Sequence, residues 1–550
     1  MMERRATPAF ETHTVDNQPP EFAPRDLWSD DGVLREGCTR EGAGSFAAAL
    51  QAYGAQAGGD LYALGFDANR DKPRLKTHDR FGHRVDLVEF HSAYHQLLHA
   101  AKAGGVAGLS WHTPRPGAHV ARAALSYLHH QAEAGTSCPL TMTHAAVPVL
   151  HREPGLREWA DKAAAPHYDP RDVPIANKAG ITLGMGMTEK QGGSDVRSNA
   201  TRATPLAGEG EYALVGHKWF FSAPMSDGWL VLAQAPGGLS CFLMPRRLPD
   251  GEKNAFRLMR LKDKLGDWAN ASSEVEFTGA WARRIGEEGR GVATILQMVM
   301  LTRLDCMLGA TAEMRMALAH AVHHARHRTS FGQPLAAHAL MRNVLADLAL
   351  ESEAAMVLAL RLARAVDARA DAPARALVRV GTPAAKLWIC KRAIHAVAEC
   401  MEVWGGNGYV EEGPMPRIYR ETPVNSIWEG SGNVMALDVL RALQREPEAL
   451  PALEQEFALA AGRHRAFDEA VARWRALLAD QAQAEFQARR VAGGLARLWQ
   501  AALLIQHAPE PVAQAFVASR LHADGGIFGE LAAGADTQAI LSRAWPAVAC

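Results

Sequence analysis

A single carboxylate beside an indole is the feature of this sequence best suited to chemistry. It is Glu429, which follows Trp428 in the segment Asn425-Ser-Ile-Trp-Glu-Gly-Ser-Gly-Asn433. A carboxylate that a protein withdraws from water becomes a stronger base, and it can take a proton from a carbon next to a carbonyl group. An ordinary loop carboxylate is the structural alternative, so this segment alone leaves both interpretations open.

Three further segments have residue types suited to holding a ligand. Adjacent glycines and two hydroxyls occur in Gly186-Met-Thr-Glu-Lys-Gln-Gly-Gly-Ser-Asp195, and an aromatic run ends in a hydroxyl at Lys218-Trp-Phe-Phe-Ser222. A flavin ring needs apolar cover and a hydrogen bond near its N5 atom. The glycines of Glu402-Val-Trp-Gly-Gly-Asn-Gly-Tyr409 expose backbone groups that could take a diphosphate. A polar turn, a core strand and a helix C-cap are the alternatives.

Composition argues against several classes of protein. The 59 basic and 60 acidic residues leave the net charge near zero, so the whole chain is not an electrostatic nucleic-acid binder, although a local basic patch is compatible with this total. The seven cysteines form no Cys-x-x-Cys pair, which favours reduced thiols in the cytoplasm over zinc or disulfides. The sequence shows no secretory signal, and no run reaches the ~18 apolar residues of a membrane-spanning helix.

The elements that position these segments are predicted from periodicity. Residues 1–30, rich in Pro and Thr, predict an arm that lies on the surface or on a partner subunit. The pattern from Gly44 to about Trp159 is helical, whereas short runs over 181–285 predict an antiparallel barrel or sandwich. This order, with helices again after Gly291, predicts an α+β fold of segregated blocks.

The second helical block begins with an apolar stripe at steps of four residues. The stripe consists of Leu296, Met300, Leu304 and Leu308, and its helix is expected to run to about Arg328. Further helices are expected at about 337–371, at 382–404 and from Ser431, and an Ala-rich helical segment at 451–550.

The order and spacing of these motifs resemble the acyl-CoA dehydrogenase family over about residues 80–447. Residues 186–195 resemble the first signature of that family, and residues 402–421 resemble the second. Arg328-Thr-Ser-Phe-Gly332 is similar to its Arg-x-x-Phe-Gly element, which contacts the FAD diphosphate across a subunit interface. The resemblance implies non-covalently bound FAD. No Gly-x-Gly-x-x-Gly lies between a strand and a helix, which disfavours a Rossmann-type FAD site.

The resemblance also implies the domain order of the acyl-CoA dehydrogenase fold. The expected divisions are an N-terminal arm and helical domain (1–180), a β-domain (181–285), a C-terminal helical bundle (286–447) and an extra helical segment (448–550).

Carried over to this sequence, the family's catalytic base is Glu429, which would take the α-proton of an acyl-CoA thioester. Some members place the base on an earlier helix, directly before an arginine. That position is Thr302, before Arg303, so Glu429 is the only candidate base. The residues expected to line the substrate cavity are Thr302, Arg303, Trp428 and Arg441.

The cofactor-binding residues implied by the resemblance come from all the motifs above. They are Met185, Met187, Thr188, Ser194, Phe220, Phe221, Ser222, Arg328, Phe331, Gly405, Gly406, Ile427, Trp428 and Asn433. Among them, Phe220 would stack on the flavin and Ser222 would lie near N5. Gly405 and Gly406 would meet the adenosine-diphosphate half of FAD bound to a neighbouring subunit.

Three departures from the typical member point to the branch of the family linked to the response to DNA alkylation. The N-terminal domain is enlarged, Trp428 stands where Tyr is common, and residues 448–550 extend beyond the family fold. This branch implies a homotetramer, weak acyl-CoA dehydrogenation (isovaleryl-CoA dehydrogenase-like) and binding of double-stranded DNA through the C-terminal segment.

The sequence offers some support of its own for DNA binding. Clustered arginines in the C-terminal segment could contact phosphates, namely Arg463, Arg465, Arg473, Arg475, Arg489 and Arg490. However, residues 451–550 contain nine Arg and no Lys against ten acidic residues, and arginine is common on solvated helices.

Two runs of histidines at helical spacing raise the question of a metal site. The runs are His320, His323, His324 and His327, and His91, His95 and His99. Four side chains on one helix cannot all reach one ion, and no supporting carboxylate or Cys is evident, so no metal is expected.

Two functional alternatives follow from the same residues. One is an ordinary enzyme of fatty or branched-chain acyl-CoA catabolism. The other is a DNA-binding protector whose flavin is structural or reacts with the alkylating agent. A nitroalkane-oxidase-like reaction is disfavoured, because that relative uses Asp where this chain has Glu429.

Overall fold

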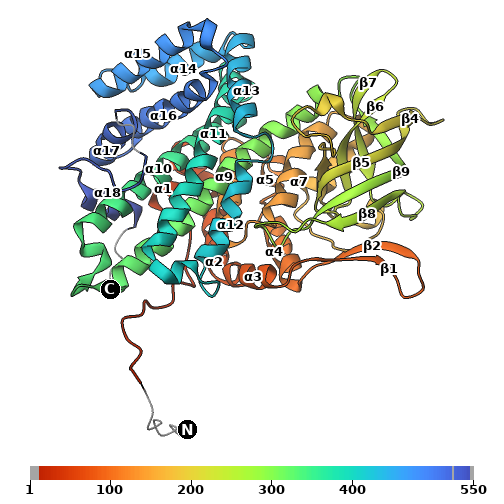
Figure 1. The fold of residues 1–550 in the computed structure, drawn as a ribbon. Helices are drawn as coiled ribbons and strands as arrows, with labels where there is room; N and C mark the ends of the chain where they lie inside the picture. The colour runs from red at the N-terminus through yellow and green to blue at the C-terminus, as the bar shows by residue number, and fades with distance from the viewer. Residues whose placement is uncertain (1–11, 523–525, 546–550) are drawn as a thin grey trace.

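The computed structural model describes residues 12–522 and 526–545. A β-domain forms one side of the molecule, and helices from both halves of the chain form the other side (Figure 1). The predicted arrangement, with the main helices and strands in separate blocks, is confirmed.

The N-terminal block is a layer of helices that contains one hairpin. The helices are α1 (Gly32–Arg40), α2 (Ala47–Gly58), α3 (Asp60–Arg70), α4 (Ser92–Ala103), α5 (Leu109–His112), α6 (Ala118–Ala132), α7 (Ser137–Leu150) and α8 (Arg157–Ala164). Strands β1 (Arg74–His78) and β2 (Arg84–Glu89) interrupt them, so the prediction of a wholly helical 44–159 is wrong here. These strands are too short to stand out from helical neighbours, and Val88 of β2 is buried in the core of the β-domain.

The arm that precedes α1 contacts the end of α9, the helix that follows the β-domain. Residues 12–24 contain no helix or strand. Asn17 donates a hydrogen bond to the carbonyl of Thr329 (2.9 Å) and accepts one from its backbone N–H (2.8 Å).

Seven strands form the β-domain. They are β3 (Leu183–Gly186), β4 (Arg202–Pro205), β5 (Glu211–Ser222), β6 (Gly228–Ala235), β7 (Gly238–Pro245), β8 (Phe256–Leu261) and β9 (Ser272–Ile285). Their order is β3-β6-β4-β5-β9-β7, and an additional β6–β7 pairing closes a ring. The expectation of a purely antiparallel sheet is wrong, because β3 and β4 both run parallel to β6. Five aromatic side chains fill the interior: Phe221, Trp229, Phe242, Phe256 and Phe277.

The second helical block is built around α9 (Gly291–His327), which ends one residue before the predicted Arg328. It packs against α6, α7, α10 (Ala339–Asp367) and α11 (Ala372–Val403). By length and mean hydropathy (1.4), α9 could cross a membrane, but 67% of that stretch is buried inside the protein, as in the core helix of a bundle.

The bundle continues with α12 (Met415–Asn425) and α13 (Gly432–Arg445), and the short strands β10 (Thr329–Ser330) and β11 (Gln333–Pro334) follow α9. Helix α12 was not predicted, because its sequence contains Pro416 and Pro423, which weaken a helical pattern.

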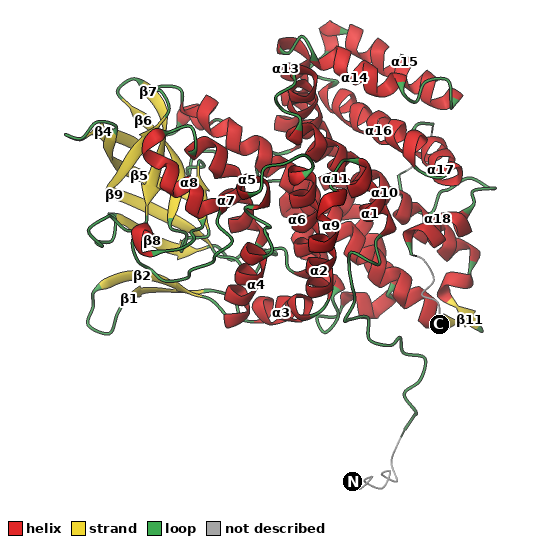
Figure 2. Ribbon diagram, turned by 180° about the vertical axis from the view of Figure 1, so that it is seen from behind, coloured by secondary structure: helices red, strands yellow, loops and turns green. Residues whose placement is uncertain are grey.

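The C-terminal segment is helical, as expected, and it packs on the bundle. Its helices are α14 (Ala449–Ala458), α15 (Arg465–Ala479), α16 (Ala488–His507), α17 (Glu510–Arg520) and α18 (Thr537–Ala544). Helix α16 lies between α15 and the helices of the bundle (Figure 2), and it contacts α10, α11 and α13. Its Trp499 is fully buried. This segment therefore shares the core of the bundle.

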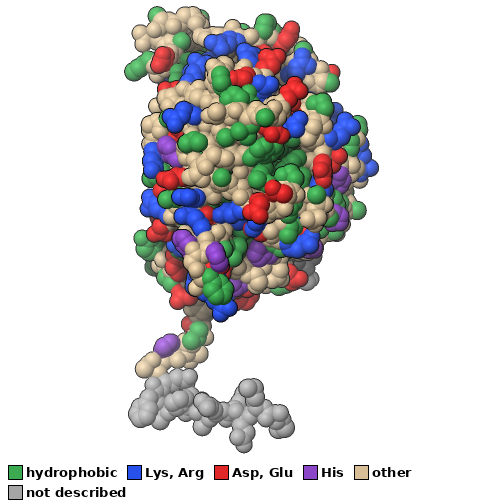
Figure 3. Space-filling model, turned by 90° about the vertical axis from the view of Figure 1, so that its right-hand side faces the viewer, with side chains coloured by type: hydrophobic (Ala, Val, Ile, Leu, Met, Phe, Trp, Pro, Cys, Tyr) green, Lys and Arg blue, Asp and Glu red, His purple; other side chains and the backbone are tan. Residues whose placement is uncertain are grey.

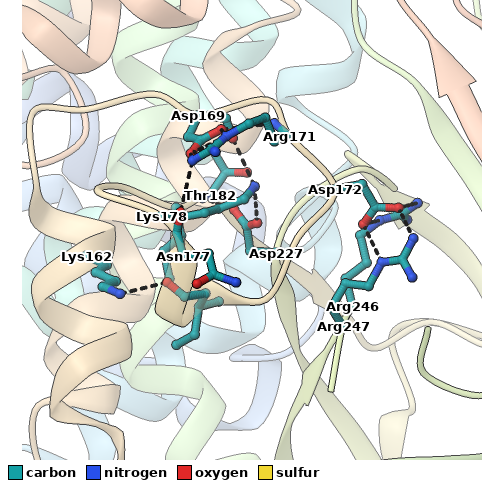
Figure 4. A network of polar contacts seen from close by, with 12 residues as sticks. Lys162, Asp169, Arg171, Asp172, Asn177, Lys178, Thr182, Asp227, Arg246 and Arg247 are labelled. Carbon is teal, nitrogen blue, oxygen red and sulfur yellow. Dashed lines mark hydrogen bonds and ion pairs between the residues drawn. The ribbon is translucent and has the colours of Figure 1, made fainter. Parts of the chain in front are cut away.

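A polar network joins the N-terminal helices to the β-domain through residues 165–182 (Figure 4). Lys178 Nζ lies 2.6 Å from Asp227 Oδ1, and the side chains of both residues are buried. Asp227 Oδ2 also accepts a hydrogen bond from the backbone N–H of Thr182 (2.9 Å). Nearby, Asp172 bridges Arg246 and Arg247. The network fixes the start of β3, which leads into the glycine-rich motif.

The substitution Asp227→Asn should therefore lower the free energy of unfolding, measured by urea denaturation, by about 3–5 kcal/mol, because it leaves the Lys178 ammonium buried without a carboxylate. The matched control is Asp263→Asn. The Asp263 side chain is 93% exposed beside Lys72, so this substitution should lower the free energy of unfolding by less than about 1 kcal/mol. Equal effects of the two substitutions would contradict this account of the network.

Candidate functional site

A cavity of about 1430 Å³ lies between the β-domain, helices α6, α7 and α9, and the loop between α12 and α13. It brings together twelve of the residues singled out in the sequence. These are Met185, Met187, Thr188, Ser194, Phe220, Ser222, Thr302, Arg303, Ile427, Trp428, Glu429 and Arg441. Segments separated by more than 200 residues in the sequence thus line a single cavity.

Glu429 occupies the loop that joins α12 to α13, and its backbone has φ +59°, in the left-handed region. A residue with a Cβ pays about 1–2 kcal/mol for this conformation. Two cations hold the loop in place: Arg303 Nε donates to the Glu429 carbonyl (2.9 Å), and Lys386 Nζ donates to the carbonyls of Asn425 and Gly430 (3.0 Å each). Strain that the surroundings maintain in this way is typical of functional positions.

The carboxylate of Glu429 faces the cavity, away from bulk water. Its desolvation raises the pKa of Glu429 above the ordinary value of 4.5, while a hydrogen bond from Thr302 and the charges of Arg303 and Lys386 act in the opposite direction. Thr302 Oγ1 lies 2.7 Å from Glu429 Oε2 and 3.0 Å from the Val299 carbonyl oxygen. Because the hydroxyl has one proton, it can donate to only one of these oxygens at a time.

The arginine beside the base is neutralised by an acid. Arg303 Nη1 lies 2.6 Å from Asp438 Oδ2, and Arg379 Nη2 lies 2.8 Å from Asp438 Oδ1. Two further arginines, Arg441 and Arg445 of α13, line the cavity at its exposed side. The rim of the cavity is therefore basic, whereas Asp438 compensates the positive charge of Arg303 next to Glu429.

The strand β5 presents one aromatic ring to the cavity and the next to the core. Side chains alternate along a strand, so Phe220 lines the cavity with 52% of its surface exposed, while Phe221 is fully buried on the other face. The Phe221 ring lies 4.8 Å from that of Trp229, between ring centroids. Phe221 was predicted to bind the cofactor, but the structure places it away from the cavity. Ser222 lines the cavity and lies 3.1 Å from Ser272, between hydroxyl oxygens.

Besides Phe221, five predicted cofactor residues lie outside the cavity of this single chain. They are Arg328, Phe331, Gly405, Gly406 and Asn433. Phe331 is 97% exposed with φ +50°, and Gly405 and Gly406 are also exposed. One chain does not bring these residues to the site. For Arg328, Phe331, Gly405 and Gly406, contact with FAD on a neighbouring subunit stays a prediction; Asn433 was expected at the site of its own chain, and the structure does not place it in the cavity.

The predicted DNA-binding arginines lie on the outer surface of the C-terminal helices, and three of them are engaged locally. Arg465 pairs with Glu469 (2.7 Å), Arg475 pairs with Glu454, and Arg473 Nη2 donates to the Leu521 carbonyl (2.9 Å).

The other three arginines of that set make no ion pair with the residues that the structure describes. Arg490 donates to the Gln487 side chain (3.1 Å), while Arg463 and Arg489 are exposed and make no such contact. The two candidate metal runs hold no metal-binding group: within residues 12–522 and 526–545, no three His, Cys, Asp or Glu side chains are placed to hold an ion.

Several cavity residues were missed in the sequence. They are polar residues of α6, α7 and α9 that line the cavity: Ser126, His130, Ser137, Thr141 and Asp305. The only available signal was the spacing of four residues between Ser126 and His130 and between Ser137 and Thr141 in largely apolar helices. Such spacing places two side chains on one face without showing which cavity that face meets.

Comparisons with known proteins agree with this geometry. Residues 17–170 match the family model of the adaptive response protein AidB N-terminal domain, residues 184–280 the acyl-CoA dehydrogenase middle domain, and residues 289–444 the acyl-CoA dehydrogenase C-terminal domain. The chain is 48% identical to the putative acyl-CoA dehydrogenase AidB of Escherichia coli, over 94% of this chain and 96% of that protein.

Solved structures give the same result. ACDH-11 of Caenorhabditis elegans in complex with C11-CoA is 27% identical, with a TM-score of 0.87 over 100% of both chains. An acyl-CoA dehydrogenase of Bacillus anthracis complexed with FAD shares the fold at 18% identity, with a TM-score of 0.63 over 78% of this chain and 80% of that one. The family consists of FAD-dependent oxidoreductases that act on CH–CH groups. By sequence identity, family models and fold together, this chain belongs to the acyl-CoA dehydrogenase family.

Proposed function

We propose that this protein dehydrogenates an acyl-CoA thioester, with Glu429 as the base that removes the α-proton. The observation that carries the proposal is the desolvated Glu429 carboxylate, which faces the cavity beside Thr302 and Trp428. The similarity to ACDH-11 in complex with C11-CoA supports a CoA thioester as the substrate.

The residues of the cavity fit the FAD of this family. The Phe220 ring is half exposed and free to stack on a flavin, and Thr188 and Ser222 offer hydroxyls at the same wall. Arg328, Phe331, Gly405 and Gly406 would contact the diphosphate of FAD in a second copy of the chain. The protein would then assemble as a homotetramer, in which each site is completed by a neighbour. When bound there, FAD would supply the acceptor for the β-hydrogen of the substrate, which leaves as a hydride.

Glu429 performs the other half of the reaction. When the α-carbon loses its proton to the carboxylate, the electron pair of that C–H bond becomes the new C=C bond as the β-hydrogen leaves. Thr302 holds Oε2 by its hydrogen bond, and Oε1 would accept the proton. The indole of Trp428 is fixed by a hydrogen bond from its Nε1 to Asn425 Oδ1 (3.3 Å), and it shields the base from solvent.

The physiological role that we propose is in the response to DNA alkylation, which the resemblance of the sequence implies; the match of residues 17–170 to the N-terminal domain of an adaptive response protein supports this role. The alternative is an ordinary enzyme of acyl-CoA catabolism. Such an enzyme would need a wide substrate channel, and the bulky Trp428 beside the base argues against one. A cytoplasmic location agrees with the six described cysteines, which are buried and unpaired; Cys550 lies outside the described residues.

DNA binding through the C-terminal segment is the second candidate function. It is favoured by the exposed, unpaired Arg463 and Arg489 on a segment that extends beyond the family fold. Charges of both signs are interspersed over the face of the molecule in Figure 3, so a DNA site would depend on a local cluster. In a tetramer, several modest clusters would act together.

This candidate predicts salt-dependent binding of double-stranded DNA. Replacing Arg463 and Arg489 with Ala should weaken binding equally for all sequences and reduce the slope of log K against log salt by about 1 for each lost phosphate contact. The measurement is fluorescence anisotropy with a labelled duplex at several salt concentrations. Arg260→Ala, an exposed arginine of the β-domain, serves as the control, and an identical effect of that control would refute the assignment.

Two adjacent substitutions should separate cofactor binding from stability. Phe220→Ala should release FAD more readily, measured by flavin fluorescence on dilution, and should change the free energy of unfolding of the FAD-free protein by less than about 1 kcal/mol. Phe221→Ala should lower that free energy by about 3–5 kcal/mol because it empties a position in the β-domain core. The reverse pattern would show that the two faces of β5 have been assigned wrongly.

Glu429→Gln should leave FAD bound and slow the anaerobic bleaching of the flavin by acyl-CoA by about 10²–10⁴-fold, the contribution of a general base. The absorbance near 450 nm, where oxidised flavins absorb, reports both properties. Glu446→Gln, on an exposed residue after α13, should leave the rate unchanged. A variant at Glu429 that bleaches at the rate of the native protein would remove Glu429 from this role.

A further inference from the structure

The cavity continues past Glu429 to a closed end. Helix α9 lines it from Val292 to Cys306. The first turns of α9 are open to solvent, with Leu296 43% exposed, whereas Asp305 and Cys306 are buried. The base meets α9 at Thr302, so the closed end lies about one helical turn, ~5 Å along the helix, beyond the reacting carbons. The distal part of an acyl group would occupy this space.

Polar side chains lie at that closed end among the less polar Cys138, Met142 and Cys306, whereas a plain hydrocarbon chain would need no polar group there. Ser126 and His130 of α6 and Ser137 and Thr141 of α7 each form a pair four residues apart, on one face of their helix. His130 Nδ1 lies 3.1 Å from Ser137 Oγ. The hydroxyl of Thr141 donates to Asp305 Oδ2 (2.7 Å).

The charges at this end are already compensated inside the protein. Arg122 forms a bidentate pair with Asp305, and both side chains are buried. His130 Nε2 lies 3.2 Å from Glu313 Oε1, which also accepts a hydrogen bond from Asn425 Nδ2 (3.1 Å). Lys264, which also lines the cavity, donates to the carbonyls of Asp267 and Asn270 (2.8 Å each) and lies near the Asp267 carboxylate. A carboxylate would therefore meet no cation without a neighbouring acid here, so the site favours a neutral polar ligand.

Several hydrogen-bonding positions nevertheless remain unused. Ser126 is 5% exposed, and its hydroxyl has no partner among the residues that the structure describes. Thr141 uses its only proton on Asp305 and keeps lone pairs free. The contact between His130 Nδ1 and Ser137 Oγ uses one hydrogen-bonding position of the serine hydroxyl, so whichever atom donates, the hydroxyl keeps at least one further position for a ligand. An apolar chain would bury these groups without compensation.

We propose that the acyl group of the substrate carries a neutral hydrogen-bonding group, such as a hydroxyl, at its distal end, and that Ser126, Ser137 and Thr141 bind it. The proposal rests on the acyl-CoA dehydrogenation proposed above and names its substrate class. A site that binds a hydroxyl discriminates strongly against the analogue that lacks it, because its own polar groups are then left unpaired.

The test compares pairs of acyl-CoAs of equal chain length, one ending in a methyl group and one in an ω-hydroxyl group. Each is mixed anaerobically with the FAD-loaded protein, and the second-order rate constant of flavin bleaching is measured by stopped flow over a series of lengths. For the length that reaches the closed end, the hydroxylated member should react about tenfold faster or more. Ser126→Ala should reduce this preference about fivefold. The matched control is Ser110→Ala, a buried helical serine outside the cavity, which should leave the preference unchanged.

The failures of the two proposals are distinguishable. Bleaching by methyl-ended chains at rates equal to or above those of their hydroxylated partners at every length would overturn the polar-end proposal and leave acyl-CoA dehydrogenation intact. Absence of bleaching by any member, with FAD bound, would overturn both. The comparison in the native protein needs no variant to fold. If Ser126→Ala folds and keeps the full preference, the assignment of Ser126 is wrong.

Discussion

The structure depends on keeping one carboxylate out of water without pairing its oxygens directly with a cation. A buried carboxylate is costly to ionise, and the protein lowers that cost only partly, through the Thr302 hydroxyl and the more remote charges of Arg303 and Lys386. Lys386 donates to backbone carbonyls, and Arg303 donates to the Glu429 carbonyl and to Asp438. Neither cation donates to the carboxylate of Glu429. The base is thereby held in place and remains basic.

The architecture follows from this requirement. The long α9 supplies Thr302 and Arg303 from a rigid, buried position, and α11 supplies Lys386 beneath the loop between α12 and α13. Because Lys386 holds the carbonyls of Asn425 and Gly430 on either side of Glu429, the backbone of Glu429 can remain in the left-handed region. The β-domain closes the opposite wall, where the alternation of β5 gives Phe220 to the cavity and Phe221 to the core.

Much of this was predictable from the sequence, because the relevant signals are local or occur in family motifs. The segregation of helices and strands, the extent of α9 and the family itself followed from periodicity and motif order. The β1–β2 hairpin and the parallel strands β3 and β4 did not, since contacts with distant segments determine them. Phe221 was misplaced because the motif does not show which face of the strand meets the cavity. The polar closed end required the packing of α6, α7 and α9 around one space, which no single segment encodes.

The central claim is that Glu429 is a desolvated base whose pKa is raised by burial and lowered in part by the Thr302 hydroxyl. The pH dependence of anaerobic flavin bleaching by acyl-CoA tests this claim most directly. The base must be ionised to act, so the rate should fall as the pH drops through the raised pKa of Glu429. Thr302→Val removes a hydrogen bond that lowers this pKa and should shift the fall to higher pH. Thr294→Val, on α9 but outside the cavity, should not shift it. Coincident profiles for Thr302→Val and the native protein, or a shift to lower pH, would contradict the account.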